Sequence, residues 1–297
     1  MAKQPRILTG QVAAITGGAR GIGRETARAM LREGMKVAIG DLDLAAAEAT
    51  AAELGPPDRI RAYPLNVTDK SSFAAFLDGA ERDLGPLDVL VNNAGIMQLG
   101  SFLEEDDATT QRQIDINVNG VLHGMKLVLP RFVSRHRGHL VNIASSAGKA
   151  GVPGGATYSG TKHFVVGVSE AVRAELLDGP IEVSCVMPVV VKTELASGLQ
   201  ETRGIKHITP QDVAEAIVDA LKVPRFDVYV PRNVAAISAV MGLMPRRGRD
   251  AVARVLKADK VLSQRDDAAR RAYELRAARS EPGLEPGANG RELTETT

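Results

Sequence analysis

The hydrophobic residues of this chain fall into short, nearly unbroken runs that alternate with longer segments of mixed polarity. The short runs predict strands, at residues 11–16, 36–40, 61–67, 87–91, 139–143, 181–187 and 226–230. The longer segments have helical composition, at residues 24–31, 44–54, 71–84, 106–125 and 209–221. Apolar strands that alternate with helices are typical of a parallel sheet covered on both faces. The pattern therefore predicts an α/β fold, a doubly wound parallel sheet of about seven strands flanked by helices.

A glycine-rich turn follows the first apolar run and leads directly into a helix. Six of its residues are candidates for binding a cofactor: Gly17, Gly18, Arg20, Gly21, Ile22 and Gly23. The spacing TGxxxGxG departs from the standard GxGxxG fingerprint, because Thr26 stands where the last glycine would be. Glycines let a pyrophosphate come close to the backbone, and the first amides of a helix favour negative charge. The order strand, glycine turn, helix predicts a Rossmann-type dinucleotide site.

A carboxylate at the end of the second predicted strand bears on which dinucleotide is bound. Asp41 follows the run 36–40, where a carboxylate accepts hydrogen bonds from the adenosine ribose and repels a 2′-phosphate. Arg20 argues the other way, since a guanidinium there can contact a 2′-phosphate, although it can equally pair with acidic neighbours or face water. Asp41 is the stronger evidence of the two, because placing a carboxylate beside a phosphate dianion is electrostatically unfavourable. NAD is therefore favoured over NADP.

The stretch ASSAGKAGVPGGATYSGTKHF, residues 144–164, concentrates the candidate chemistry. Tyr158 and Lys162 are four residues apart, which places phenol and ammonium on one face of a helix. A nearby cation favours the phenolate, so such a pair suits proton transfer near neutral pH. Ser145 follows the apolar run 139–143, at a strand end. Taken alone, the spacing of Tyr158 and Lys162 more often indicates a half-buried aromatic ring beside a solvated cation. The other motifs make a catalytic pair the better interpretation.

Two asparagine-containing motifs lie at the ends of other predicted elements. The fourth strand runs into Asn92-Asn93-Ala94-Gly95, whose small residues let a cofactor pass over the strand ends. An ordinary Asn-Gly turn is the alternative, and it fits less well after a buried strand. Asn117 lies in IDINVNG, within a predicted helix, where an asparagine is by itself more often a packing or surface residue.

These motifs together resemble the short-chain dehydrogenase/reductase family, in its compact single-domain branch. The resemblance rests on residues 16–23 and 92–95, on Asn117 and Ser145, and on Tyr158 with Lys162, in the family's order. It runs from about Leu8 to about Pro231. It implies a catalytic set of Asn117, Ser145, Tyr158 and Lys162. It also implies cofactor contacts beyond the glycine turn and Asp41, from Asn66, Val67, Asn93, Ala94, Gly95, Tyr158, Lys162, Pro188, Val191 and Thr193.

The resemblance implies an NAD-dependent oxidoreductase that interconverts a secondary alcohol and a ketone by hydride transfer. Tyr158 is then the general acid and base, and Ser145 positions and polarises the reacting oxygen. Lys162 lowers the tyrosine pKa and holds the nicotinamide ribose, while Asn117 holds a water that links Lys162 to solvent. An NADP-dependent ketone reductase of the same family and a non-catalytic dinucleotide sensor are the alternatives, and the complete set argues against a sensor. The resemblance further implies a homodimer or homotetramer.

The loop after the sixth predicted strand departs from the family pattern. Val189 stands after Pro188 where relatives have glycine, which puts the path of this loop in doubt. Residues 194–204 are expected to form a substrate lid, although an ordered surface helix is the alternative. Leu195 and Leu199 give the lid an apolar lining, so the expected substrate is lipophilic, a steroid-, retinoid- or terpenoid-like alcohol.

Composition excludes several classes of function. The chain has 37 basic and 36 acidic residues, which gives no argument for a nucleic-acid partner. Its single cysteine, Cys185, lies in an apolar run and is expected to be a buried thiol. The five histidines show no metal-ligand spacing, so no metal is expected. The N-terminus lacks an apolar signal region, and a cytoplasmic location is expected.

The C-terminal part has a different character from the rest. We expect residues 1–231 to form the dinucleotide-binding and catalytic domain, 232–279 a helical extension, and 280–297 a disordered tail rich in Gly, Pro and Glu. The extension begins with an uncharged apolar stretch at 234–244, followed by Arg246, Arg247 and Arg249. Such a segment is too short to span a membrane, but residues 234–260 allow peripheral contact with an anionic surface. A helix that covers the substrate pocket or a subunit seam is an equal alternative.

Overall fold

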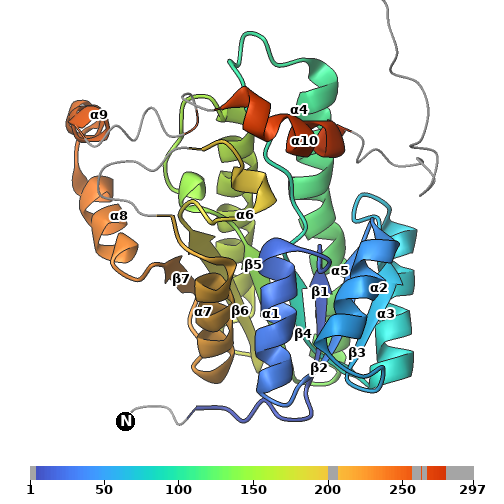
Figure 1. The fold of residues 1–297 in the computed structure, drawn as a ribbon. Helices are drawn as coiled ribbons and strands as arrows, with labels where there is room; N and C mark the ends of the chain where they lie inside the picture. The colour runs from blue at the N-terminus through green and yellow to red at the C-terminus, as the bar shows by residue number, and fades with distance from the viewer. Residues whose placement is uncertain (1–4, 200–206, 256–261, 263–265, 279–297) are drawn as a thin grey trace, which may run out of the picture.

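A seven-stranded parallel sheet forms the centre of the molecule (Figure 1). The computed structural model describes residues 5–199, 207–255, 262 and 266–278. The strand order is β3-β2-β1-β4-β5-β6-β7. The strands are β1 (Val12–Thr16), β2 (Lys36–Asp41), β3 (Ile60–Pro64), β4 (Leu87–Asn92), β5 (Gly138–Ile143), β6 (Ile181–Pro188) and β7 (Asp227–Val230). The predicted Rossmann-type α/β fold is confirmed.

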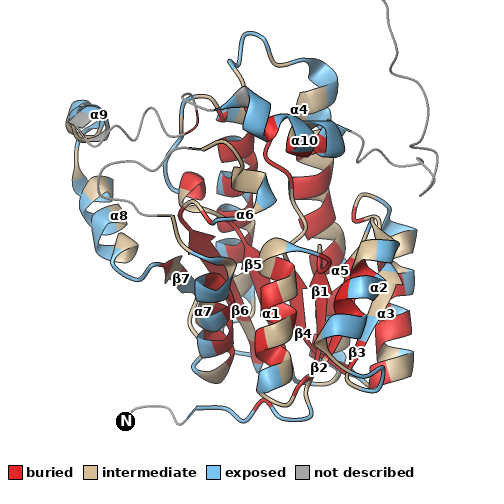
Figure 2. Ribbon diagram, in the orientation of Figure 1, coloured by how far each residue is buried: buried red, intermediate tan, exposed pale blue. Residues whose placement is uncertain are grey.

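Helices cover both faces of the sheet because alternate strand residues are apolar on both sides. Ala13 and Ile15 of β1 belong to one core cluster, and Val12 and Ala14 belong to the other. The first cluster is covered by α1 (Gly21–Arg32), α2 (Leu44–Leu54) and α7 (Pro210–Lys222). The second is covered by α3 (Lys70–Leu84), α5 (Gly120–Ser134) and α6 (Ala156–Glu175). Figure 2 shows these inner helix faces as buried.

The chain reverses its winding direction between β1 and β4, which are neighbours in the sheet. In a doubly wound sheet, ligands bind outside the carboxyl ends of the strands at such a switch point. The predicted helix 106–125 is in fact α4 (Asp107–Ile114), a π-helical turn η1 (Asp115–Asn119) and the start of α5. Single π-helical turns within α-helices are frequent at functional sites.

Three helices follow β7, and they lie in two different places. Helix α8 (Val234–Leu243) and α9 (Arg246–Val255) extend beside β7, away from the sheet (Figure 1). Helix α10 (Asp267–Ala278) returns over the carboxyl ends of the strands, where it contacts η3 (Glu194–Ala196) (Figure 1). No residue of α8 is buried, whereas α10 buries Arg270, Tyr273 and Ala277. The predicted tail at 280–297 lies outside the described residues.

No helix within the described part of the chain has the length and apolar character needed to cross a membrane.

Candidate active site

The glycine turn forms a backbone cradle at the start of α1. Gly17 and Gly21 have φ angles of +65° and +53°, a region that favours glycine. A Cβ on Gly17 would lie 2.9 Å from the Ala94 Cα atom, and a Cβ on Gly23 would lie 2.1 Å from the Gly17 carbonyl oxygen. Helix α1 has no side-chain N-cap and no acidic residue in its first turn, so its first amides are not neutralised by the chain itself. The cradle therefore fits a pyrophosphate.

The end of β4 is fastened to the glycine turn. The Asn93 side-chain amide donates to the carbonyl oxygens of Thr16 and Gly17, at 2.9 and 3.0 Å. The Thr16 hydroxyl accepts from the backbone amides of Asn93 and Ala94, both at 2.9 Å. Asn93 thus fixes the two strand ends between which a cofactor would lie.

Asp41 lies at the carboxyl end of β2, beside the glycine turn. Its Oδ2 accepts from the Ala19 amide at 3.0 Å, and its Oδ1 accepts from the Asp43 amide at 3.1 Å. Burial raises the pKa of the Asp41 carboxyl above its ordinary value. Arg20 forms an ion pair with Asp43 at 2.6 Å. Of the three roles left open for Arg20 by the sequence, the structure shows pairing with an acidic neighbour.

Ser145, Tyr158 and Lys162 meet at the carboxyl end of β5. Ser145 follows the strand, and its Oγ accepts from the Ala147 amide at 3.1 Å. Tyr158 and Lys162 lie in the first two turns of α6 on its inner face, and both are buried. The Lys162 Nζ donates to the Ile143 carbonyl oxygen at 3.0 Å and lies 5.7 Å from the centroid of the Tyr158 ring. The predicted placement of phenol and ammonium on one helix face is what the structure shows.

The pKa values of this pair differ from the expected direction. Burial raises the pKa of Tyr158 to about 12, against a lowering by hydrogen bonding with Ser145. Burial also lowers the pKa of Lys162 to about 8. Desolvation is the largest influence on both pKa values, and no lowering by Lys162 offsets it for Tyr158. The Tyr158 phenol is consequently protonated at neutral pH, where it can donate a proton.

Asn117 lies behind the cavity wall, in the π-helical turn. Its Oδ1 accepts from the Ile96 amide, and its Nδ2 donates to the Ile96 carbonyl oxygen, both at 2.9 Å. The Nδ2 also donates to the Thr161 hydroxyl at 3.2 Å. A Cβ on Gly95 would lie 3.0 Å from Asn117 Oδ1 and 3.6 Å from Lys162 Nζ, so both side chains lie directly beside Gly95. Asn117 therefore holds the loop after β4 beside Lys162, and its water-binding role stays a prediction.

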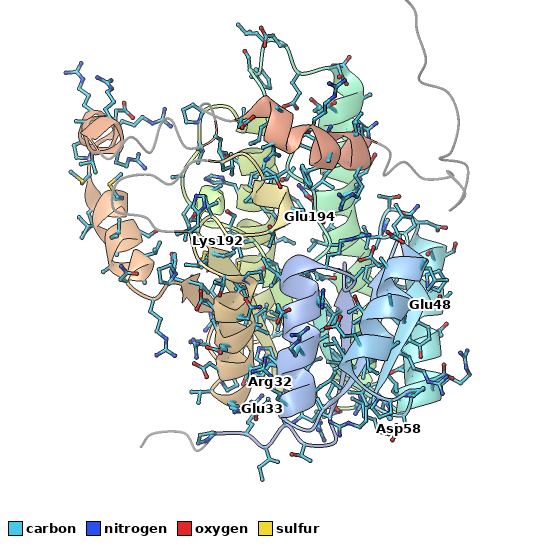
Figure 3. The ribbon with its side chains drawn as sticks, in the orientation of Figure 1. Arg32, Glu33, Glu48, Asp58, Lys192 and Glu194 are labelled. Carbon is cyan, nitrogen blue, oxygen red and sulfur yellow. The ribbon has the colours of Figure 1, made fainter. Side chains whose placement is uncertain are left out.

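Val189 is accommodated without strain. Its amide donates to the Val230 carbonyl oxygen at 3.0 Å, which continues the pairing of β6 with β7. Within the described residues, His136 is the only non-glycine residue with a positive φ angle. The loop then returns through a bridge between Val191 and Ile208. Figure 3 places Lys192 and Glu194 at the end of the sheet where α1 begins, opposite Arg32 and Glu33 where α1 ends.

One cavity of about 2090 Å³ joins these parts at the carboxyl ends of the strands. All the predicted site residues line it except Gly18, Gly23 and Asn117, which lie behind its surface. Gly18 packs against β2 instead, because a Cβ there would lie 2.5 Å from the Ile39 Cβ. No group of three or more His, Cys, Asp or Glu side chains suited to a metal ion occurs among the described residues.

The part of this cavity around Tyr158 contains an apolar cluster and is partly formed by residues that follow β7. Tyr158 packs in a cluster with Met97, Leu99, Ala147 and Leu262. Tyr273 of α10 also lines the cavity. The sequence did not identify Leu262 or Tyr273 as site residues. No local pattern distinguishes Leu262 from its neighbours, and Tyr273 lies in α10, which has the composition of a charged surface helix.

Comparison with known proteins places the chain in a family. Residues 11–204 match the family described as short chain dehydrogenase, and the chain belongs to this family. A 3-alpha-(or 20-beta)-hydroxysteroid dehydrogenase of Mycobacterium tuberculosis is 40% identical over 196 residues, 65% of this chain and 74% of the relative. The 2-(S)-hydroxypropyl-CoM dehydrogenase 3 of Xanthobacter autotrophicus is 35% identical over 71% of this chain and 89% of its own length.

Solved structures agree with this placement. A short chain dehydrogenase/reductase from Burkholderia phymatum in complex with NAD is similar, with a TM-score of 0.73 and 26% identity, over 80% of this chain and 94% of that one. The 3-ketoacyl-(acyl-carrier-protein) reductase of Brucella melitensis complexed with NADH has a TM-score of 0.67 and 29% identity, over 76% of this chain and 99% of that one. The protein is thus an oxidoreductase with the NAD-binding Rossmann fold of its family.

Proposed function

We propose that this protein is an NAD-dependent oxidoreductase that interconverts a lipophilic secondary alcohol and its ketone. The observation that carries the proposal is the single cavity in which the glycine cradle and Asp41 open onto Ser145, Tyr158 and Lys162. A phosphate cradle alone serves any dinucleotide-binding protein. A cradle continuous with a hydroxyl, a phenol and an ammonium group supports proton and hydride transfer at a carbinol carbon.

In this proposal the reacting oxygen lies between Ser145 and Tyr158. The Ser145 hydroxyl orients this oxygen, and Tyr158 gives it a proton during ketone reduction or removes one during alcohol oxidation. A dinucleotide bound in the cradle would supply the hydride acceptor for alcohol oxidation and, in its reduced form, the hydride donor for ketone reduction. Lys162 would hold the nicotinamide ribose, and Asp41 the adenosine ribose. Asn117 acts as a positioning residue for the loop after β4, and in the proposal it also holds the water that links Lys162 to solvent.

The apolar lining supports a lipophilic substrate. Met97, Val152, Leu195, Leu199 and Leu262 line the substrate side of the cavity. The similarity to a hydroxysteroid dehydrogenase supports a rigid polycyclic alcohol, while the hydroxypropyl-CoM relative shows that the family also contains enzymes named for polar substrates. We propose a steroid-, retinoid- or terpenoid-like alcohol. The test is the appearance of NADH when the protein is given NAD and such alcohols. NADPH formation from NADP alone would favour the reductase alternative, and NADH binding without turnover would favour the sensor.

Replacing Asp41 by asparagine is expected to shift cofactor preference toward NADP. The carboxylate repels a 2′-phosphate, and like charges in contact cost several kcal/mol, so the ratio of kcat/KM for NADP to that for NAD should rise about tenfold to a hundredfold. Initial rates with both cofactors at one alcohol concentration measure this ratio. Glu48→Gln is the matched control, since it removes one negative charge from an exposed position on α2. An equal ratio in Asp41→Asn and Glu48→Gln would exclude Asp41 as the discriminating residue.

Helices α8 and α9 support a peripheral membrane contact. Ile237, Val240 and Leu243 on α8 are 47%, 60% and 89% exposed, and arginines of α9 follow directly. Exposed apolar side chains beside arginines bind anionic bilayer surfaces. We propose that α8 and α9, together called the arm, bind such a surface while the catalytic domain stays in the cytoplasm.

Sedimentation with lipid vesicles tests the arm. The protein should pellet with vesicles that contain phosphatidylserine, pellet several-fold less with pure phosphatidylcholine, and lose binding as salt is raised. Leu243→Asp should weaken the binding. Leu103→Asp should not, because Leu103 is 94% exposed but lies on the loop between β4 and α4. Equal binding to neutral and anionic vesicles, or none to either, would contradict the contact.

We also propose a homodimer or homotetramer. Helix α6 supports this, because Phe164 is 38% exposed and a Cβ on Gly160 or Gly167 would meet no atom within 4 Å. A helix face with small residues and an exposed aromatic ring suits close packing against a second copy. In the proposed organisation, residues 1–231 form the catalytic domain and residues 232–279 the extension.

A further inference from the structure

Helix α10 is fastened over the cavity by one buried arginine. The side chain of Arg270 is 1% exposed, and its guanidinium donates to three backbone carbonyl oxygens, Met97 at 2.6 Å, Leu195 at 2.9 Å and Ser197 at 3.2 Å. Its Nε donates to Glu274 at 2.7 Å. Met97 belongs to the loop after β4, and Leu195 belongs to the segment after Thr193. Arg270 therefore ties α10 to two separate walls of the same cavity.

Tyr273 lies one turn further along this helix and reaches the cavity. Its hydroxyl oxygen accepts a hydrogen bond from the Met97 amide at 2.7 Å. Its ring packs against Arg270, whose guanidinium carbon is 4.9 Å from the ring centroid. The residue is 9% exposed, and it lines the cavity. Two neighbouring groups thus hold the phenol in one orientation.

The proton of the Tyr273 hydroxyl is not used within the described part of the protein. That hydroxyl accepts from Met97 and donates to none of the described residues. A hydroxyl has one donor and two acceptor positions, and a buried donor left unpaired costs free energy. Burial also raises the pKa of Tyr273 above its ordinary value, so the phenol keeps this proton at neutral pH. The Tyr273 hydroxyl can therefore donate one hydrogen bond to an acceptor atom in the cavity.

Met97 connects Tyr273 with the reacting end of the cavity. The Met97 side chain packs in the same apolar cluster as Tyr158, while its backbone holds both Arg270 and Tyr273. Tyr273 and Tyr158 therefore lie at the same cavity, joined by Met97. The cavity wall combines apolar residues such as Val152, Leu195 and Leu262 with polar ones such as Ser146, Glu194 and Arg276.

We propose that Tyr273 is a specificity-determining residue whose hydroxyl donates a hydrogen bond to a second oxygen of the substrate. The preferred substrates are then secondary alcohols or ketones on an apolar frame that also carry an acceptor oxygen, such as a further carbonyl or an ether. The inference rests on the proposed function, and it adds a second polar contact for the substrate besides Ser145 and Tyr158.

Matched secondary alcohols test the inference. All the alcohols share one hydrocarbon skeleton. The control alcohol has no second oxygen, and the others carry an ether or ketone oxygen at increasing distance from the carbinol carbon. The parent should oxidise at least one oxygenated alcohol with a higher kcat/KM than the plain alcohol, by about three- to tenfold, the net effect of one hydrogen bond. Tyr273→Phe should abolish this preference. Tyr63→Phe should preserve it, because the Tyr63 hydroxyl bonds to Gly79 and Asp83 outside the cavity.

The outcomes separate the inference from the proposed function. If Tyr273→Phe lowers kcat/KM equally for the plain and the oxygenated alcohols, Tyr273 only supports the Met97 amide and the inference is overturned. The same holds if the parent shows no preference among alcohols that it oxidises. A parent enzyme that oxidises none of the alcohols with NAD or NADP instead overturns the proposed function, and with it the substrate class argued here.

Discussion

Phenylalanine in place of Tyr158 is expected to lower kcat by about 10²- to 10⁴-fold, the usual contribution of a positioned general acid or base. NADH binding should stay near the parental value, because the change removes one hydroxyl from a ring that keeps its packing against Met97 and Leu262. Steady-state rates and the fluorescence of bound NADH measure the two quantities separately. Near-parental turnover in this variant would exclude Tyr158 as the proton-transfer group.

The pH dependence of the parent enzyme provides the control for this variant. Because burial raises the pKa of Tyr158 to about 12, the phenol is protonated at neutral pH. Alcohol oxidation needs the phenolate, so its kcat/KM should rise about tenfold per pH unit up to about pH 8, the pKa of Lys162, above which Lys162 loses its charge. Ketone reduction needs the phenol and should change little over the same interval. The residual activity of Tyr158→Phe should lose the slope for oxidation.

Methionine in place of Arg270 is expected to release α10 from the catalytic domain. Three backbone carbonyl oxygens lose a buried donor, those of Met97, Leu195 and Ser197. Such a loss costs about 3 kcal/mol, or roughly a hundredfold in the equilibrium between docked and undocked helix. Hydrogen exchange should accelerate in α10 and in residues 194–198. Exchange in the sheet should stay as in the parent, because the hydrogen bonds of Arg270 go to groups outside the strands.

Arg271 provides a matched control on the same helix. It is the next residue along, but it is exposed, so Arg271→Met removes the same charge without removing a buried donor. Unchanged exchange in Arg271→Met with fast exchange in Arg270→Met would assign the effect to the buried hydrogen bonds. Parental exchange of α10 in both variants would show that Arg270 does not hold the helix.

The fold was predictable because it depends on local patterns. Continuous apolar runs such as residues 87–91 are stable only between two layers of helices, and the turn at residues 16–23 admits few backbone paths. The placement of Tyr158 beside Lys162 followed from helical periodicity alone. The family motifs added Ser145 and Asn117, which the structure brings to the same region.

Other properties of the site depend on burial and long-range contact, which no local pattern records. The pKa of Tyr158 is raised by burial, whereas the motif predicted that Lys162 would lower it. Arg20 has Asp43 as its partner only because the glycine turn meets the end of β2. Arg270 and Arg271 are indistinguishable in sequence, yet one is buried and the other is exposed. The sequence left open that the extension covers the pocket, and α10 does line the cavity, but the sequence did not indicate that Arg270 and Tyr273 are the residues involved.

The central claim is that one cavity joins NAD to an alcohol at Tyr158. Its most direct test is the formation of NADH or NADPH from NAD or NADP with secondary alcohols that range from short and polar to steroid-like, with Tyr158→Phe assayed beside the parent. We expect NADH to form with the bulky apolar alcohols and the rate to fall by at least about a hundredfold in the variant. Equal turnover by parent and variant, or NADH binding without turnover of any alcohol, would contradict the account.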